Sequence, residues 1–489
     1  MTKDVDAYVA APGRDDLVRQ VRAKIDELDI DFIYYQYISI TGRIMGKLAP
    51  APHWEAMAAK GIQTWYGGLT NVLPSRAGTL LGFPSNAHEL VAIPDPDTFC
   101  RLPWNKRTAR VFCTVFYGRE EDEKPGAFME EDCRGNLRRV HQQFMADHGG
   151  LHLRHGCEPE MAWLKKGPDG MPDGGPTKPL AYHIDQFEEL SSVYMKVIDY
   201  SHAMGLDMIQ GDHEDAPGQL ELNFTFDDAL RTCDRLTTYR QICAQVAREQ
   251  GLIACFMTKP FMGVSANGCH HNMSLWRGGA DEIVARVPAP LPGVDGVFHH
   301  RKGGENVFID KPDEWMPGPV GLNAIGGILE HLPALTAIGS STVNSYRRML
   351  DLGLWAPVYA DWGYQNRTTS LRASAPGRIE YRAVDSMVNP YLMAAALLKA
   401  MDDGIRRKLD PGKPEQRNIY EAMEAGKQVK RLPRYFGDAL DALAADKVIK
   451  SAMPGRLYEI YDEYKRDEWD RFNAEVSDWD LKRYLDCLP

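Results

Sequence analysis

Apolar residues recur at helical spacing in several segments of the chain. In residues 16–29, five apolar side chains fall on one face of a helix, namely Leu17, Val18, Val21, Ile25 and Leu28. The same spacing predicts further helices at 130–147, 187–204, 227–250, 320–331 and 390–408. Strand-like apolar runs lie between them, the first at 31–40 and 110–117. This mixture of elements predicts the α+β fold class.

A charged stretch, GREEDEKPG at 118–126, interrupts both patterns and is the best candidate for a domain boundary. With 489 residues, the chain exceeds the roughly 100–200 residues of a typical domain. We therefore expect a small α+β domain at 1–120 and a larger domain at 121–489. Glycine and proline at 166–179 predict a surface loop within the larger domain.

The composition excludes several classes of protein. A chain with 44% hydrophobic and 26% charged residues is neither a long disordered segment nor a coiled-coil rod. Its net charge of −11 disfavours nucleic acid or an anionic membrane as a partner. No apolar stretch is long enough to span a bilayer, and nine cysteines without a CxxC pair indicate buried thiols in a reducing compartment. We therefore expect a cytoplasmic protein with no nucleic-acid or membrane partner.

Two strand-like segments carry pairs of acids. Glu158 and Glu160 share one strand face, where they repel each other unless a metal ion or an arginine lies between them. Residues 212–226 predict a hairpin with an Ala-Pro-Gly turn, which brings Glu214 and Glu221 towards one end. An exposed strand face and a plain surface hairpin are the alternatives, and the hairpin residues by themselves favour the second.

A third segment, 267–275, alternates two sets of side chains. One face carries His270, Asn272 and Ser274, and the other carries Cys269, His271 and Met273. The Cys-His-His run suggests zinc, but neighbouring residues on a strand point in opposite directions, so one histidine ligand is favoured. A hydrogen-bonded core histidine is the alternative.

The fourth segment places Arg378, Glu380 and Arg382 on one strand face. A structural ladder of ion pairs is the usual explanation of such a pattern. Four more arginines crowd the preceding stretch of this acidic protein, namely Arg347, Arg348, Arg367 and Arg372. Planar, bidentate donors beside a set of carboxylates suit a polyanion that is held through metal ions.

Taken together and in this order, the segments resemble the glutamine synthetase family. The matching stretches are GCEPE, GDHEDAPGQLE, FMTKPFMGVSANGCHHNMS, NSYRRM, WAPV, QNRTTSLR, GRIEYR and NPYLMAAALLKAMDDGI, which run in family order from residue 156 to 405. The resemblance implies a β-grasp-like N-terminal domain and a catalytic domain with a curved antiparallel sheet flanked by helices. It also implies a homo-oligomeric ring, with a dodecamer of two hexamers favoured and active sites between subunits.

The resemblance further implies roles for individual residues. Glu160, Glu214 and Glu221 match ligands of one Mg²⁺ or Mn²⁺, and Glu158, His270 and Glu380 match ligands of a second. Five carboxylates among six ligands suit these hard cations better than zinc. The catalytic arginines would be Arg348, Arg367 and Arg382, and the nucleotide would meet Phe226, Ser274, Arg372 and Arg378. Glutamate would be bound by Asn267, Gly268, Arg348 and Arg382.

The reaction implied by the resemblance has two steps. The γ-carboxylate of glutamate attacks ATP to give an acyl phosphate, and an amine then displaces phosphate. Relatives that use ammonia carry two carboxylates at the ammonium site, where this chain aligns Tyr66 and Trp355. Loss of that negative charge predicts a small organic amine as substrate, first an aromatic amine that stacks on the two rings.

Several alternatives to an anilide synthetase remain open. A methylamide or other alkylamide synthetase comes second, and a plain glutamine synthetase that uses ammonia is a further possibility. A silent scaffold with this fold would be expected to lose ligands, yet all six positions are filled. A two-metal hydrolase would have no use for so many arginines.

Overall fold

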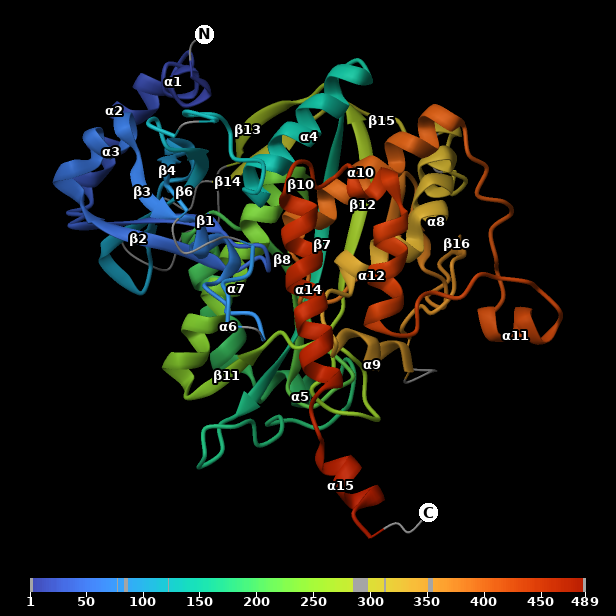
Figure 1. Ribbon diagram of the computed structural model, residues 1–489. Coiled ribbons are helices and arrows are strands. Elements are labelled where there is room, and N and C mark those ends of the chain that lie inside the picture. Colours follow the sequence, from blue (N-terminus) through green and yellow to red (C-terminus); the bar gives the residue numbers. More distant parts are fainter. Residues whose placement is uncertain are drawn as a thin grey trace.

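The computed structural model describes residues 3–76, 78–82, 87–121, 123–284, 298–311, 314–350 and 355–486. The chain forms a smaller N-terminal unit and a larger unit built around two long strands, β7 (Leu151–Lys165) and β12 (Cys269–Arg277) (Figure 1). Both units combine helices with sheets whose strand pairs are mostly antiparallel, which confirms the α+β class. None of the described helices is both long enough and apolar enough to cross a membrane.

A six-stranded sheet forms the N-terminal unit. Its order is β2-β1-β6-β4-β3, with β5 paired to β6, and β1 runs parallel to β6 while the other pairs are antiparallel. The strands are β1 (Phe32–Ile38), β2 (Ile44–Pro50), β3 (Ile62–Trp65), β4 (Glu89–Pro94), β5 (Cys100–Leu102) and β6 (Asn105–Tyr117). The helices of this unit are α1 (Asp4–Val9), α2 (Arg14–Glu27) and α3 (Trp54–Lys60), with short 3₁₀ turns η1 (Ala51–His53), η2 (Tyr66–Thr70) and η3 (Pro96–Thr98).

A ten-stranded sheet forms the centre of the larger unit. Its order is β16-β17-β18-β12-β7-β9-β8, with β10 and β11 paired to β7 and β15 paired to β12. The remaining strands are β8 (Met208–His213), β9 (Gln219–Phe224), β10 (Asp227–Asp228), β11 (Leu252–Cys255), β15 (Glu305–Asn306), β16 (Trp362–Tyr364), β17 (Leu371–Ala375) and β18 (Arg378–Tyr381). A separate hairpin pairs β13 (Ala280–Val284) with β14 (Phe298–Lys302).

Helices cover one face of this sheet and form the main core with it. Apolar side chains of α7 (Ala229–Gln250), α8 (Pro319–Gly339) and α10 (Pro390–Arg407) pack with inward residues of β7 and β12. Other helices are α4 (Cys133–Asp147), α5 (Ile184–Glu188), α6 (Ser191–Ala203), α9 (Ser345–Leu350), α11 (Ile419–Glu424), α12 (Phe436–Ala445), α13 (Lys447–Lys450), α14 (Leu457–Asn473) and α15 (Asp478–Tyr484). The opposite face of β7 and β12 carries the polar residues singled out above.

Most elements predicted from periodicity are present, with two differences. The helix expected at 187–204 is divided between two helices, since α5 ends at Glu188 and α6 begins at Ser191. The helix expected at 320–331 continues to Gly339, since Pro333 lies within α8 without ending it. The loop at 166–179 contains no helix or named strand. The division of the chain near residue 120 stays a prediction.

Candidate active site

Three strands bring Glu158, His270 and Glu380 together. His270 on β12 lies opposite Glu158 on β7, and its Nδ1 is 3.1 Å from Glu158 Oε2. The same nitrogen is 3.4 Å from Glu380 Oε1 on β18. These three side chains form a cluster whose donor atoms could share one ion. The juxtaposition follows from the antiparallel register, because β12 lies between β7 and β18.

Glu160 and Glu221 form a second acidic group beside the first. They are direct register partners across β7 and β9, and both are buried. Glu214 follows β8, and its backbone N–H donates to the carbonyl of Gln219 at the predicted turn. The hairpin therefore folds as expected, but its acids face a buried polar surface and not the solvent.

Burial and repulsion between carboxylates dominate the electrostatics of this surface. Burial, together with the charge of Glu214, raises the pKa of Glu160 well above its usual range. Burial and the charge of Glu158 do the same for the pKa of Glu221. Burial and the nearby Asp212 raise the pKa of Glu214 to about 7. These buried carboxylates resist ionisation when they face only one another, and a cation bound among them would favour their charged forms.

The side chains of Glu160 and His270 approach the backbone of Gly268 closely. A Cβ at that position would lie 2.9 Å from both Glu160 Oε1 and His270 Nε2. The backbone of Gly268 is itself fixed, since its N–H donates to Glu160 Oε2 at 2.8 Å and its carbonyl accepts from Ser386 Oγ at 2.7 Å. A donor set of carboxylate oxygens and one imidazole around this glycine fits Mg²⁺ or Mn²⁺.

The arginines predicted as catalytic lie in different surroundings. Arg382 and Arg372 both donate to Glu380, the second through Nη1 to Oε2 at 2.7 Å, so the strand face is a partial ion-pair ladder. Arg348 is buried and donates to the backbone carbonyls of Val384 and Arg382. Arg367 is exposed, and its charge acts on Asp212 and Glu214.

The remaining arginine prediction, Arg378, lies at an exposed edge of the site. Its Nε donates to Ser374 Oγ at 2.8 Å, and Ser374 Oγ donates to Asn272 Oδ1 at 3.4 Å. Asn272 in turn donates to Glu158 Oε1 at 2.7 Å. A polar chain therefore connects this exposed guanidinium to the cluster around His270.

Both polar atoms of the Asn267 side chain, which was predicted to bind glutamate, form hydrogen bonds within the chain. Its Nδ2 donates to the carbonyl of Met257 at 2.8 Å, and its Oδ1 accepts from Gln219 Nε2 at 2.9 Å. The same Gln219 amide donates to Glu160 Oε2 at 3.2 Å. Asn267 and Gly268 thus hold the carboxylates in place through their own hydrogen bonds.

The two residues predicted to meet the nucleotide base lie near Trp276. Phe226 is 45% exposed, its ring centre is 6.4 Å from that of Trp276, and Trp276 Nε1 donates to Ser274 Oγ at 2.7 Å. The guanidinium of Arg154 lies 4.4 Å from the centre of the Trp276 ring. The structure thus gathers these side chains into one aromatic and cationic group on the edge of the sheet.

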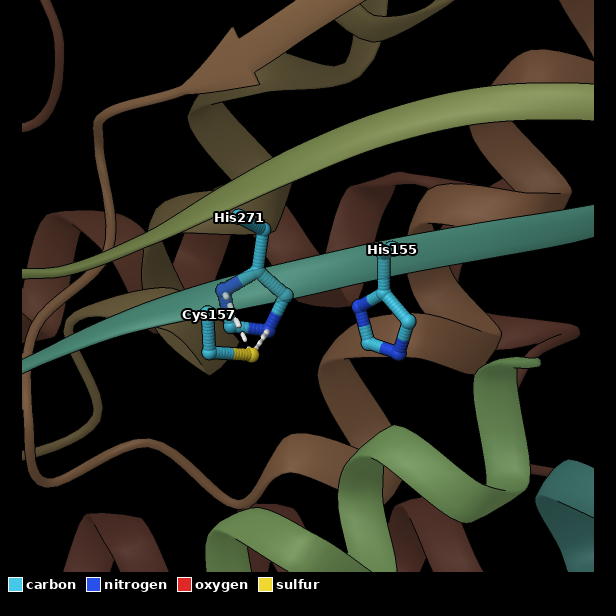
Figure 2. A group of neighbouring side chains, drawn as sticks. All are labelled: His155, Cys157 and His271. Carbon is cyan, nitrogen blue, oxygen red and sulfur yellow. Dashed lines mark hydrogen bonds between the residues drawn. The ribbon is translucent and has the colours of Figure 1, made fainter. Parts of the chain in front are cut away.

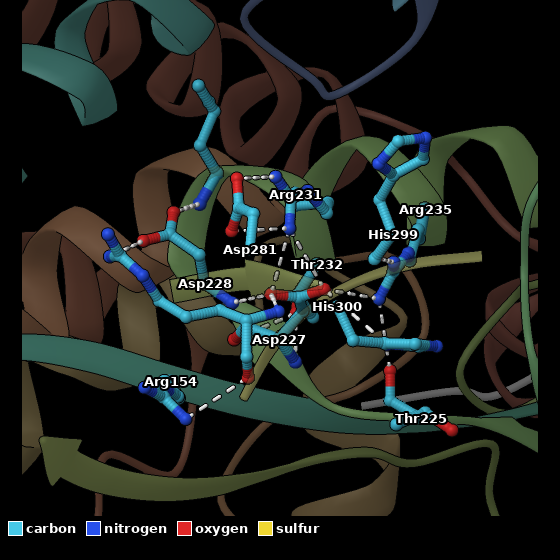
Figure 3. Close-up of polar contacts among 12 residues, drawn as sticks. Arg154, Thr225, Asp227, Asp228, Arg231, Thr232, Arg235, Asp281, His299 and His300 are labelled. Atoms are coloured by element: carbon cyan, nitrogen blue, oxygen red, sulfur yellow. Dashed lines mark hydrogen bonds and ion pairs between the residues drawn. The ribbon is translucent and has the colours of Figure 1, made fainter. Parts of the chain in front are cut away.

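A buried carboxylate fixes the backbone on each side of Phe226. Figure 3 shows Asp227 within a group of polar side chains that includes Arg231, Arg235 and His300. Burial alone would raise the pKa of Asp227, but the hydrogen bond from His300 and the two guanidinium charges outweigh it and hold the pKa well below its usual range. Arg235 also donates to the carbonyl of Thr225, so Phe226 projects from an anchored segment.

The two aromatic residues predicted for the amine pocket have different environments. Tyr66 is buried in the core of the N-terminal unit, 6.1 Å from the ring centre of Tyr117. Trp355 is 58% exposed, and its carbonyl accepts from Arg382 Nη2 at 3.5 Å. Within one chain, therefore, Trp355 presents an accessible ring and Tyr66 does not.

Sequence reasoning gave no role in the site to several residues of this surface. Asp212 pairs with Glu221 in register, and burial together with the charge of Glu158 raises its pKa to about 6. Asn272 and Gln219 each bind a carboxylate, and their alternation with His270 and Glu221 along the strands was the available signal. Ser386, which joins the carbonyls of Glu160 and Gly268, follows a strand and carried no pattern.

Comparisons with known proteins agree with this geometry. The family model described as "Glutamine synthetase, catalytic domain" matches residues 130–290 and 281–484. A glutamine synthetase of Methanocaldococcus jannaschii is 31% identical over 96% of this chain and 98% of its own length. A glutamate–methylamine ligase of Methyloversatilis universalis is 32% identical over 94% of this chain and 98% of its own length.

Solved structures give the same result for the fold. A structure described as a GmaS/ADP complex has a TM-score of 0.81 and 29% identity, and it covers 96% of this chain and 99% of the matched chain. A structure of GmaS without ligand has a TM-score of 0.79 and covers 95% of this chain. The fold, the ordered motifs and the acidic surface therefore agree with one another. The chain belongs to the glutamine synthetase family, whose members are ATP-dependent enzymes that form carbon–nitrogen bonds.

Proposed function

We propose that this enzyme joins the γ-carboxylate of glutamate to a small organic amine, with ATP as co-substrate and γ-glutamyl phosphate as intermediate. The observation that carries the proposal is the buried acidic surface of β7, β9 and β12, which is flanked by arginines on β17 and β18. Such a surface suits phosphoryl transfer, where the main task is to neutralise and position charge.

Two or more Mg²⁺ or Mn²⁺ ions would be held by the six residues predicted as ligands. Glu160, Glu214 and Glu221 would hold one ion, and Glu158, His270 and Glu380 a second. When bound, these cations would supply neutralisation of the phosphate oxygens and the carboxylates. The oxygen-rich donor set and the close approach of Gly268 support this assignment.

The chain's own arginines would bind and orient the reacting groups. Arg382 is buried between Glu380 and the carbonyl of Trp355, so its guanidinium is fixed before substrate arrives. Arg367 is exposed and has room to contact the transferred phosphoryl group. Fixed donors of this kind require little rearrangement during the reaction, and no covalent bond to the protein is needed.

The nucleotide would lie at the end of the sheet marked by Phe226 and Ser274. The anchored ring of Phe226 offers an apolar face for a base, and Arg372 and Arg378 offer cationic groups for phosphates. The similar structure described as a GmaS/ADP complex supports an adenine nucleotide as a ligand of this chain.

For the amine, Trp355 would stand where the family resemblance places a carboxylate in relatives that use ammonia. An exposed indole attracts an uncharged aromatic amine through stacking and burial of apolar surface. An aniline-like substrate is therefore our first choice. Methylamine is the second, because one of the similar enzymes is named a glutamate–methylamine ligase.

Phosphate release from ATP tests these proposals. The full chain is incubated with glutamate, ATP, Mg²⁺ and, separately, aniline, methylamine or ammonia, and the γ-glutamyl product is identified by mass spectrometry. Amide formation with an organic amine at a higher kcat/KM than with ammonia supports the proposal. A preference for ammonia over both amines would make this a plain glutamine synthetase, and no phosphate release with any of them would indicate a silent scaffold.

Matched variants of Trp355 identify the role of the ring. Trp355→Ala should raise the KM for aniline about tenfold through lost apolar contact, whereas Trp355→Phe should keep most of the affinity. Trp355→Glu restores a carboxylate and should shift preference towards ammonia. If Trp355→Ala leaves the KM for every amine unchanged, the amine does not contact this ring.

We also propose a homo-oligomeric ring, with a dodecamer of two hexamers favoured. Within one chain, Tyr66 is buried in the core of the N-terminal unit. It is far in sequence from the residues of the acidic surface. A neighbouring subunit would complete the amine pocket from that unit. Analytical ultracentrifugation tests the stoichiometry, and a monomeric, fully active enzyme would contradict the shared site.

A further inference from the structure

Beneath the acidic surface, on the core face of the same strands, lies a second group of metal-ligating side chains. His155 and Cys157 alternate with Glu158 on β7, and His271 follows His270 on β12. Figure 2 shows the three side chains turned towards one another. Their donor atoms lie within 4.8 Å of one another, and all three residues are buried.

The hydrogen bonds of this group leave donor atoms without ordinary partners. His155 Nε2 lies 3.2 Å from the carbonyl of Ala229, while the buried Nδ1 of the same ring has no hydrogen-bond partner. His271 Nδ1 forms a hydrogen bond with the carbonyl of Cys269 at 2.8 Å. Nε2, on the other side of the ring, takes no part in that bond. Cys157 Sγ lies 3.9 Å from this Nε2 and 4.0 Å from Nδ1, at the long limit of a hydrogen bond to sulfur.

We propose that His155, Cys157 and His271 bind a thiolate-preferring metal ion, Cu⁺ or Zn²⁺, at a structural site separate from the catalytic cations. Metal–sulfur and metal–nitrogen bonds of about 2.3 and 2.1 Å place neighbouring donor atoms roughly 3.5 Å apart in a tetrahedral site. The donor atoms of the three side chains, which lie within 4.8 Å of one another, would draw closer on binding.

The surroundings of the group agree with a bound cation. Neither imidazole has a carboxylate partner among the ion pairs of the described residues, and a buried imidazole without one stays neutral and keeps a lone pair.

Charge balance distinguishes the two ions. One thiolate and two neutral imidazoles neutralise Cu⁺, so a monovalent ion needs only the three residues above. Zn²⁺ needs a second thiolate to be neutral in an apolar core, and the nearest candidate along β12 is Cys269, two residues before His271. Cys233, whose Sγ lies 3.9 Å from His155 Nε2, is a more distant neighbour.

The site would hold together the two strands that carry the catalytic residues. His271 is the register partner of Cys157, and His270 is the register partner of Glu158 one residue along. An ion on the core face therefore fixes the spacing of β7 and β12 directly behind the acidic surface. Its loss should loosen both strands and lower the stability of the whole larger unit.

Metal analysis of the full chain tests the proposal without any mutation. The protein is produced in medium supplemented separately with zinc, copper or cobalt, and the loosely held cations are removed by dialysis against EDTA. We expect about one chelator-resistant ion per chain. For the cobalt form we expect a thiolate-to-cobalt charge-transfer band, which carboxylate and imidazole ligands of the catalytic face cannot produce. Retention of copper or of zinc identifies the ion.

Cys157→Ser and His155→Phe should each reduce the retained ion at least fivefold and remove the band, while Cys243→Ser, a buried cysteine outside the group, should retain both. A wild-type chain with no retained ion and no band in any of the three media would overturn the proposal. So would a Cys157→Ser variant that keeps the band. The wild-type measurement decides the question even if a variant does not fold.

Discussion

Replacement of Glu380 by glutamine should both abolish catalysis and measurably destabilise the fold. Glu380 is fully buried, and its two oxygens accept hydrogen bonds from Arg372 and Arg382. Glutamine has nearly the same shape, but it removes the negative charge and places an NH₂ donor opposite an arginine donor. The substitution therefore leaves two guanidiniums beside a neutral group.

The size of the effect follows from the burial of the carboxylate. Removing one partner of a buried ion pair costs about 3–5 kcal/mol, and we take about 3 kcal/mol because the Arg372 side chain keeps some contact with solvent. An unfolding entropy of about 2.1 cal/mol/K per residue amounts to about 1 kcal/mol/K for 489 residues. The expected decrease in Tm is therefore about 3 °C, and the loss of charge neutralisation should lower kcat about a hundredfold or more.

Differential scanning calorimetry and the phosphate-release assay measure the two effects on the same preparation. Glu305→Gln is the matched control, because Glu305 pairs with Arg277 on the surface and is 70% exposed. That variant should change Tm by less than 1 °C. If Glu380→Gln kept both wild-type Tm and turnover within twofold, the proposed role of this carboxylate would be refuted.

Three further substitutions test other parts of the molecule. Arg367→Lys should lower kcat at least tenfold with an unchanged Tm, because an ammonium cannot reproduce bidentate contacts to phosphoryl oxygens; near-normal turnover would make Arg367 dispensable. Gly268→Ala should impair activity and metal binding, since its Cβ would lie 2.9 Å from Glu160 and from His270, and calorimetric titration with Mn²⁺ would detect this. For His331, burial alone would lower the pKa, but hydrogen bonds to Asp446 and Asp403 outweigh it and raise the pKa. Its stabilising contribution is therefore complete below about pH 6.5 and is lost as the pH rises through the folded-state pKa. In urea unfolding, the free energy of unfolding should therefore decrease less between pH 6 and 9 for His331→Gln than for the wild type.

Periodicity predicted the elements well where the apolar pattern was continuous. The helices at 16–29, 227–250 and 390–408 are present as α2, α7 and α10 within two residues at each end. The end of α8 could not be predicted, because Pro333 usually marks a helix boundary and here the packed core maintains the helix around it.

Strand alternation also predicted which side chains share a face, but not how deeply that face is buried. Alternation assigned Glu158, His270 and Glu380 each to a strand face, the family resemblance grouped them, and the strand order β18-β12-β7 gives the physical reason that they meet. Likewise, His271 and Cys157 come together on the other face because they are register partners, which sequence spacing alone does not reveal. Partners such as Ser386 depend on tertiary contacts between segments more than 100 residues apart.

The connection between the first and last parts of the chain constrains how the protein is made. Ile460 of α14 is part of the apolar core of the N-terminal unit, and Asn71 donates to the hydroxyl of Tyr464, a residue 393 positions later. Translation at about 5–20 residues per second would supply that helix roughly 20–80 s after the N-terminal segment that it contacts. During this interval the nascent unit exposes the apolar surface that Ile460 later buries, so ribosome-bound chains that end before α14 should bind chaperones more than full-length chains do.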